Sequence, residues 1–154
     1  MLKNFLAQLW RRVPSRVRRW TVRITNPRFT VTAAAVVFND DGEILLLKHL
    51  FRTGSGWGLP GGFLKPGEQP LAALRRELQE EIGLDLDHVE IFGARSFKRP
   101  RQVEILFRGK ASNQAQPRSI EVERAEWFRP DNLPTGLPAD QKLLIERVVG
   151  KQQI

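Results

Sequence analysis

Hydrophobic and polar positions change their period along this chain of 154 residues. Residues 2–13 place apolar side chains at i, i+3, i+4, i+7, i+8 and i+11, the stripe of an amphipathic helix, and Pro14 is expected to stop or kink it. Residues 29–38 and 43–50 are largely apolar and flank the turn sequence NDDG, which predicts a strand hairpin whose first strand is buried. The pattern therefore indicates a helical leader followed by a sheet-forming domain.

A second helix is predicted after a glycine-rich loop at residues 51–62. Pro70 suits the first turn of that helix, and Gly83 suits the position just past its end. At about 3.6 residues per turn, four apolar side chains fall on one side of this helix, so we expect that side to face a sheet. These four are Leu71, Leu74, Leu78 and Ile82.

Three strand-like segments follow, at residues 89–97, 103–112 and 122–130, and a closing helix is expected from Ala139 to Val149. The polar segment 113–119 is expected to be an exposed loop. The order of a hairpin, a helix, several strands and a closing helix predicts an α/β domain with a mixed sheet.

Composition narrows the classes of protein. The chain has no cysteine, which excludes disulfides, thiolate zinc sites and a cysteine nucleophile, and suits a reducing compartment such as the cytoplasm. Eight of the 25 basic residues lie among the first 39, which contain no Asp or Glu, so the remaining chain holds 17 basic and 17 acidic residues. We therefore expect a basic leader at residues 1–27 and a neutral domain at residues 28–151.

Three interpretations of the leader stay open. It packs as an arm on its own domain or on a second copy in a homodimer, or it lies on a membrane surface with its arginines facing anionic head groups. The third interpretation is a transit peptide or an arm in which residues 1–25 contact RNA. Arginines interrupt its apolar positions, which argues against a secretory signal peptide.

Glutamates crowd the predicted central helix. Glu77, Glu80 and Glu81 lie on it and Glu68 stands just before it, although like charges one turn apart destabilise a helix. A solvated charged face is the simple explanation. The alternative is a divalent cation among the carboxylates, because Mg²⁺ prefers hard oxygen ligands and substrate phosphates.

The spacing of these residues resembles the signature of the Nudix hydrolases at every fixed position. The matching positions are Gly62, Glu68, Arg76-Glu77-Leu78, Glu80-Glu81 and Gly83-Leu84. The resemblance implies a Nudix-like α/β/α sandwich with a mixed β-sheet, preceded here by the N-terminal basic amphipathic helix. It also implies an enzyme that hydrolyses the pyrophosphate linkage of a nucleoside diphosphate joined to another group.

The same resemblance implies roles for individual residues. Glu77, Glu80 and Glu81 match positions that bind Mg²⁺ or Mn²⁺, and one of them orients or deprotonates the attacking water. The Gly61 carbonyl resembles a further metal ligand, and Arg76 and Glu68 resemble a pair that braces the loop against the helix. A later glutamate that completes the metal set is assigned to Glu121, although Glu123 and Glu126 are near it in sequence.

The substrate is less defined by the sequence. ADP-ribose-like compounds and (deoxy)nucleoside triphosphates are the leading classes, and the alternatives are removal of pyrophosphate from the 5′ end of RNA or a non-catalytic nucleotide-binding module. Basic and aromatic side chains that could contact phosphates or a base, or else be surface charges and core aromatics, are Lys48, Arg52, Trp57, Arg95, Phe97, Lys98, Arg99 and Arg101. The two histidines, His49 and His88, are expected to have packing or surface roles.

Overall fold

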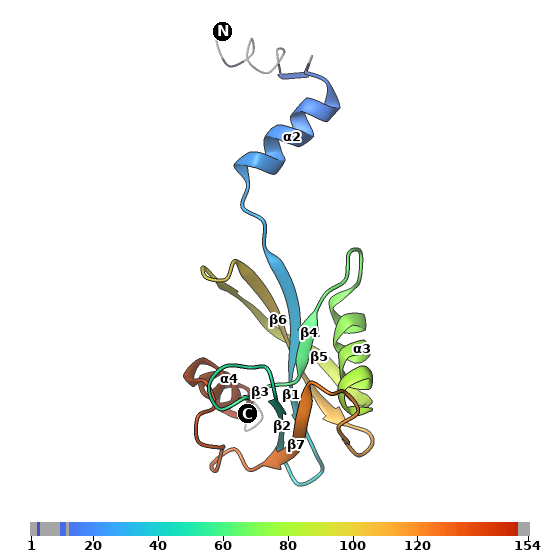
Figure 1. Ribbon diagram of the computed structural model, residues 1–154, viewed down its shortest axis with the longest axis vertical. Coiled ribbons are helices and arrows are strands. Elements are labelled where there is room, and N and C mark those ends of the chain that lie inside the picture. Colours follow the sequence, from blue (N-terminus) through green and yellow to red (C-terminus); the bar gives the residue numbers. More distant parts are fainter. Residues whose placement is uncertain (1–2, 4–9, 12, 151–154) are drawn as a thin grey trace.

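The computed structural model describes residues 3, 10–11 and 13–150 (Figure 1). Its longer helices are α2 (Ser15–Thr25), α3 (Pro70–Ile82) and α4 (Ala139–Gly150). Its strands are β1 (Thr30–Phe38), β2 (Ile44–His49), β3 (Trp57–Gly58), β4 (Gly61–Phe63), β5 (Leu86–Phe97), β6 (Gln102–Ala111) and β7 (Val122–Phe128). Within the described residues these strands form one seven-stranded mixed sheet, with α3 on one face and α4 on the other. The predicted α/β/α sandwich is confirmed.

Strand β1 is the centre of the sheet. It pairs in parallel with β6 along its whole length, while its other edge pairs with β4 and then with β2. Its alternate side chains enter two separate cores: Ala33, Ala35 and Val37 pack on the α3 side, and Ala34, Val36 and Phe38 pack on the α4 side. A strand covered on both faces needs a continuous apolar run, and this is why its sequence does not alternate with polar residues.

Helix α3 begins and ends at the residues predicted for it. Pro70 is in its first turn, and Gly83 adopts a left-handed conformation with φ of 63°. The Gly83 N–H donates to the Gln79 carbonyl and the Leu84 N–H donates to the Leu78 carbonyl, both at 3.2 Å, which closes the helix end. Leu74, Leu78 and Ile82 are fully buried as predicted.

Leu71 departs from the prediction, since its side chain is 36% exposed and lies outside both cores. It belongs to the first turn of α3, where the helix runs past the buried cluster. Ala73 is fully buried instead. Helical periodicity assigns a side chain to a face, but it does not say how far the sheet extends beneath that face.

The predicted loop at residues 51–62 contains the short strand β3 and the start of β4. In β4, Gly61 pairs with Ala34 and comes so close to β1 that a Cβ on it would lie 2.2 Å from the Ala33 carbonyl oxygen. The glycines that suggest a loop are therefore needed for close strand packing.

Most of the helix predicted over residues 2–13 lies outside the described residues, but Lys3, Trp10 and Arg11, which are described, are helical. Pro14 instead precedes α2, a helix that the sequence analysis did not predict. Figure 1 shows α2 standing clear of the sheet and joined to β1 by a short extended segment. None of the helices in the described part of the chain is long and apolar enough to cross a membrane.

Candidate active site

Glu77 lies directly over the backbone of β4. A Cβ on Gly62 would lie 2.3 Å from the Glu77 carboxyl carbon and 2.6 Å from its Oε1, so a side chain at this position would displace the carboxylate from where it lies. The close approach of Gly61 to β1 fixes the position of the same strand. These two glycines therefore bring the acidic face of α3 against the edge of the sheet.

The Arg76 guanidinium connects the acidic residues of this region. Its Nε and Nη2 donate to the two carboxylate oxygens of Glu68 at 2.8 and 2.9 Å. Its Nη1 donates to Glu77 at 2.8 Å and to Glu80 at 3.2 Å, and Nη2 also donates to the Phe63 carbonyl at 3.1 Å. One side chain thus joins α3 to β4 and to the loop that precedes the helix.

The bonds between Arg76 and Glu68 keep both of these groups charged. The hydrogen bonds from Arg76 and from the Lys65 N–H lower the pKa of Glu68 to about 2, and the same Glu68 carboxylate raises the pKa of Arg76. Arg76 therefore offsets part of the negative charge that α3 concentrates.

Glu81 has no such compensation. Its Oε2 atom is buried and, among the described residues, has no hydrogen-bond partner. Burial and, to a smaller extent, the charges of Glu77 and Glu121 raise the pKa of Glu81 to about 7, although Arg52 acts in the opposite direction. Glu121, immediately before β7, thus lies within the electrostatic surroundings of Glu81.

A divalent cation suits this group in its chemistry. All the candidate ligands are hard oxygens, and an unpaired buried carboxylate oxygen is a costly arrangement without an ion or a donor. As the described side chains stand, however, no three acidic or imidazole groups converge as a ready-made site. Arg76 draws Glu77 and Glu80 toward itself, so an ion would have to share these two carboxylates with the guanidinium.

A cleft of about 240 Å³ adjoins the two glycines on the α4 side of the sheet. Its charged and polar lining comes from four different elements and a loop. These residues are Thr32, Arg52, Arg95, Gln102, Glu104 and Gln141. The cleft includes Gly61 and Gly62 in its wall, so it opens beside the acidic helix.

The two predicted arginines in this cleft differ in their bonding. Arg95 is held by the carboxylates of Glu104 and Asp140, which ties β5 and β6 to α4. Arg52 forms no ion pair with a described residue, and its guanidinium lies over the backbone of Gly58. Burial lowers the pKa of Arg52, although the charges of Glu81 and Glu104 oppose this shift. Its donors are therefore available to an anionic ligand in the cleft.

The six other predicted substrate residues, Lys98 and Arg101 among them, do not line the cleft. Trp57 is only 9% exposed and packs edge-on against Phe128 in the core. Lys48 pairs with Glu123 across β2 and β7, and Phe97 lies under the Arg95 guanidinium. Arg99 is at the exposed turn between β5 and β6.

Sequence reasoning missed Thr32, Gln102, Glu104 and Gln141. Gln102 donates to Thr32 Oγ1 at 2.8 Å, and Gln141 accepts the Leu59 N–H at 2.8 Å. The sequence carries a weak indication for Glu104, because an acidic residue within an otherwise apolar strand is unusual. Its partner, Arg95, lies directly opposite it in the β5–β6 register.

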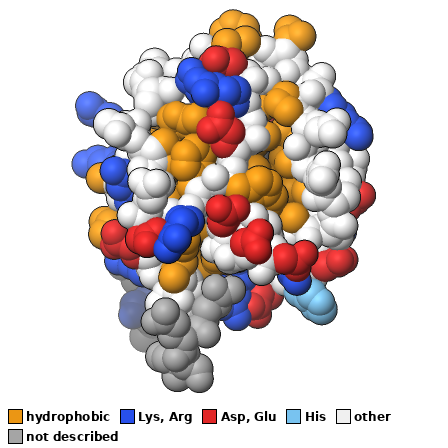
Figure 2. Space-filling model, turned by 90° about the horizontal axis from the view of Figure 1, so that it is seen from below, with side chains coloured by type: hydrophobic (Ala, Val, Ile, Leu, Met, Phe, Trp, Pro, Cys, Tyr) orange, Lys and Arg blue, Asp and Glu red, His pale blue; other side chains and the backbone are white. Residues whose placement is uncertain are grey.

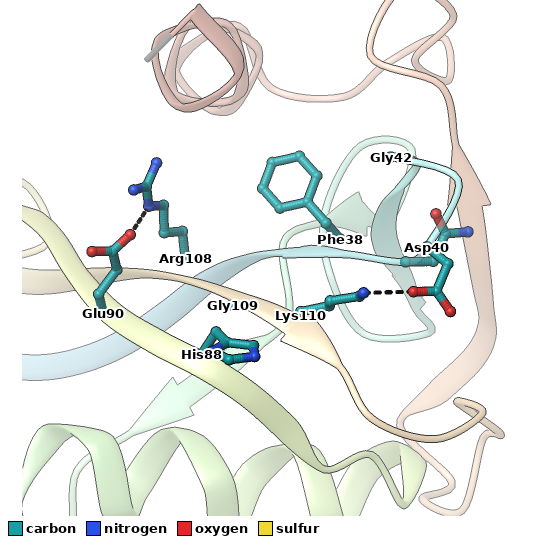
Figure 3. A pocket seen from close by; sticks show the side chains of 9 residues that line it. Phe38, Asp40, Gly42, His88, Glu90, Arg108, Gly109 and Lys110 are labelled. Atoms are coloured by element: carbon teal, nitrogen blue, oxygen red, sulfur yellow. Dashed lines mark hydrogen bonds and ion pairs between the residues drawn. The ribbon is translucent and has the colours of Figure 1, made fainter. Parts of the chain in front are cut away.

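A second, open cleft of about 530 Å³ lies at the far end of β1 and β6 (Figure 3). Its charges neutralise one another, because Lys110 pairs with Asp40 at 2.6 Å and Arg108 pairs with Glu90. His88 also lines it, from a position where φ is 50°. Neither Gly61 nor Gly62 lines this second cleft.

Carboxylates on a helix beside an arginine-lined cleft suit an enzyme that acts on phosphoanhydride bonds. The model of the NUDIX domain family matches residues 28–148, and the chain belongs to this family. The prediction of a Nudix-type pyrophosphohydrolase is confirmed at this level.

Individual relatives are more distant. A MutT-like protein of Streptomyces ambofaciens is 32% identical over 108 residues, which cover 70% of this chain and 68% of that protein. The NAD-capped RNA hydrolase NudC of Stutzerimonas stutzeri is 29% identical over 118 residues, covering 76% of this chain, which spans only 42% of that relative.

Solved structures share the fold. A MutT NUDIX hydrolase from Burkholderia pseudomallei superposes with a TM-score of 0.71 at 26% identity, covering 79% of this chain and 99% of its own. The NUDIX domain of Shewanella oneidensis NrtR, crystallised with ADP ribose, gives 0.69 at 21% identity over 95% of this chain and 97% of its own.

Replacing Arg76 by lysine is expected to lower the free energy of unfolding by about 1–3 kcal/mol, because an ammonium cannot reproduce the paired bonds to Glu68. Arg129→Lys is the matched control. Arg129 also makes two bonds to one carboxylate, that of Asp131, but its side chain is 71% exposed compared with 19% for Arg76. The control should change stability by less than about 0.5 kcal/mol. Urea unfolding in EDTA measures both, and equal losses would contradict the assignment.

His49, at the end of β2, is expected to make stability depend on pH. Its Nε2 is buried and has no partner among the described residues, and burial, assisted by Arg52, lowers its pKa from 6.5 to about 4. The unfolded chain therefore binds this proton more readily between these values, so the free energy of unfolding falls as the pH decreases from 6.5 towards 4.

Changing His49 to glutamine should remove this contribution, on the order of 1 kcal/mol between pH 7 and pH 4.5 after allowance for solvent screening. Denaturant unfolding of wild type and variant at both pH values measures it. His88→Asn, which removes the exposed histidine, is the control. A His49→Gln variant with the pH dependence of the wild type would rule the effect out.

Proposed function

We propose that this chain is a Mg²⁺-dependent hydrolase that cleaves the pyrophosphate linkage of a nucleoside diphosphate joined to another group. The observation that carries the proposal is the Glu81 carboxylate, whose buried Oε2 has no hydrogen-bond partner among the described residues and which feels the charges of Glu77, Glu121 and the cleft residue Arg52. Family membership supports the same reaction class. Either Mg²⁺ or Mn²⁺ suits the oxygen ligands.

Glu77, Glu80 and Glu81 are the proposed holders of the cation, with the Gly61 carbonyl and Glu121 as additional ligands. When bound, the ion would neutralise phosphate oxygens and lower the pKa of water. When no ion is bound, Arg76 holds the carboxylates together, because it pairs with Glu77, Glu80 and Glu68 at once. We assign to Arg76 and Glu68 a positioning role.

Glu81 is the proposed acceptor of the proton from the attacking water, since Oε2 is the carboxylate oxygen left without a bond. Arg52 is the proposed phosphate ligand, since its guanidinium lines the cleft without an ion pair to a described residue. Arg95 is held by two carboxylates, so its proposed role is to shape the cleft and hold Glu104 in place.

The size and lining of the cleft favour a small nucleotide. About 240 Å³ accommodates part of a nucleoside diphosphate derivative, and the amides of Gln102 and Gln141 offer donors and acceptors for a base or a ribose. ADP-ribose-like compounds and (deoxy)nucleoside triphosphates remain the two leading classes. The NUDIX domain of NrtR that binds ADP ribose supports the first of them only through its fold.

A substrate panel tests the proposal. We expect Mg²⁺-dependent release of a nucleoside monophosphate or phosphate from ADP-ribose or from a nucleoside triphosphate, abolished by EDTA and restored by excess Mg²⁺. Chromatography of products identifies the bond that is cleaved. Tight nucleotide binding without turnover across the panel, with both metals, would contradict the proposal and favour a binding module.

A second candidate is hydrolysis of a pyrophosphate at the 5′ end of RNA. Relatives 27–31% identical to this chain are named NAD-capped RNA hydrolases, although the chain spans less than half of their length. The basic first 39 residues provide charge for a nucleic acid. NAD, NAD-capped RNA and 5′-triphosphorylated RNA therefore belong in the same panel, and a preference for the capped RNA over free NAD would favour this candidate.

Glu81→Gln is expected to lower kcat at least about a hundredfold, because the amide cannot accept the proton or hold the cation. Its stability in EDTA should not fall, since the change removes a buried charge that lacks a partner. Glu123→Gln is the matched control, because Glu123 lies on β7 two residues from Glu121 and pairs with Lys48 away from the cleft. A Glu81→Gln variant with full activity would overturn the proposed role.

A further inference from the structure

Helix α2 carries an apolar stripe that no described residue covers. Val17, Trp20 and Ile24 follow one another at helical spacing, and their side chains are 49%, 66% and 59% exposed. Arg18 and Arg19 lie on the opposite side, because at about 100° per residue each is roughly 130° around the helix from the middle of the stripe, whereas Arg16 lies one turn before Trp20. The helix is therefore amphipathic, with a basic polar face and an exposed apolar face.

A second basic element lies beside the base of this helix. The turn between β5 and β6 has the sequence Lys98-Arg99-Pro100-Arg101, and all four residues are exposed. The Thr30 N–H donates to the Arg101 carbonyl at 3.0 Å, and Ile24, Arg28 and Arg101 line one open cleft of about 570 Å³. The turn and the helix thus belong to the same end of the molecule (Figure 1).

Charge distinguishes this end from the rest of the protein. Residues 1–29, which precede β1, and the turn at 98–101 contain no acidic side chain. The face at the opposite end, which Figure 2 presents, carries Asp and Glu side chains interspersed with Lys and Arg. A surface with one sign of charge at one end favours an anionic partner that approaches from that side.

We propose that α2 and the β5–β6 turn together form a docking surface for an anionic lipid bilayer. The apolar stripe selects this partner over a nucleic acid, since phosphate contacts need only the basic face, whereas an interfacial helix buries apolar side chains below the head groups. Trp20 suits the boundary between head groups and acyl chains. The arginines of the helix and of the turn then face anionic head groups from two elements. This inference is independent of the proposed reaction.

Sedimentation of the full chain with vesicles tests the docking surface. We expect binding to vesicles of phosphatidylcholine with 30% phosphatidylglycerol, and binding at least roughly tenfold weaker to phosphatidylcholine alone and at high salt. The pair of substitutions Val17→Asn and Ile24→Asn leaves the charge unchanged and should weaken the binding roughly tenfold. The pair Lys98→Gln and Arg101→Gln keeps the stripe and should also weaken it roughly tenfold.

Two further measurements keep the test decisive. Tryptophan emission of the wild type should shift to shorter wavelength with the anionic vesicles, and Trp20→Phe should bind but lose most of that shift. Since α2 stands clear of the sheet (Figure 1), the substitutions on it should leave the sandwich intact. Circular dichroism and urea unfolding check that each variant is folded. Unchanged vesicle binding after Val17→Asn with Ile24→Asn overturns the proposal. Binding of the full chain to a single-stranded RNA, without binding to either type of vesicle, would also overturn the proposal.

Discussion

The guanidinium of Arg76 is the contact on which the candidate site depends. It bonds to the carboxylates of Glu68, Glu77 and Glu80 and to the carbonyl of Phe63, so it joins the helix, the preceding loop and the edge strand. Three glutamates of α3, Glu77, Glu80 and Glu81, lie within little more than one turn and would otherwise repel one another. One positive charge with five donors in a plane can bond to several carboxylates at once, whereas an ammonium has only three donors at a single point.

The compensation is uneven, and the unevenness has a chemical consequence. Arg76 offsets Glu68, Glu77 and Glu80, while Glu81 faces the interior without a donor and its pKa rises to about 7. The fold imposes this difference, because α3 is fixed by fully buried Leu78 and Ile82 and cannot rotate to expose Glu81. The packing that stabilises the helix thus holds one carboxylate in a state that an isolated helix would avoid.

Local rules predicted the elements that are determined by their own residues. The continuous apolar run of β1, the Pro70 start and the Gly83 end of α3 each have a local physical cause, and the structure has them where the sequence indicated. The spacing of the glutamates along α3 is likewise a property of one segment. By contrast, Trp57 became a core residue and Arg95 became an ion-pair partner of Asp140. Both outcomes depend on residues more than forty positions away, which no local pattern encodes.

The same reasoning explains why α2 keeps an exposed stripe. Strand β1 sends its alternate side chains into two cores, and α3 and α4 each complete one of them with fully buried leucine, isoleucine or valine. Both faces at the centre of the sheet are therefore covered by α3 and α4, and no free apolar surface is left there for α2. Val17, Trp20 and Ile24 have no complementary surface on the described domain. An amphipathic helix gains most of its stability from burying its apolar face, so α2 needs a partner outside the sandwich to be well formed.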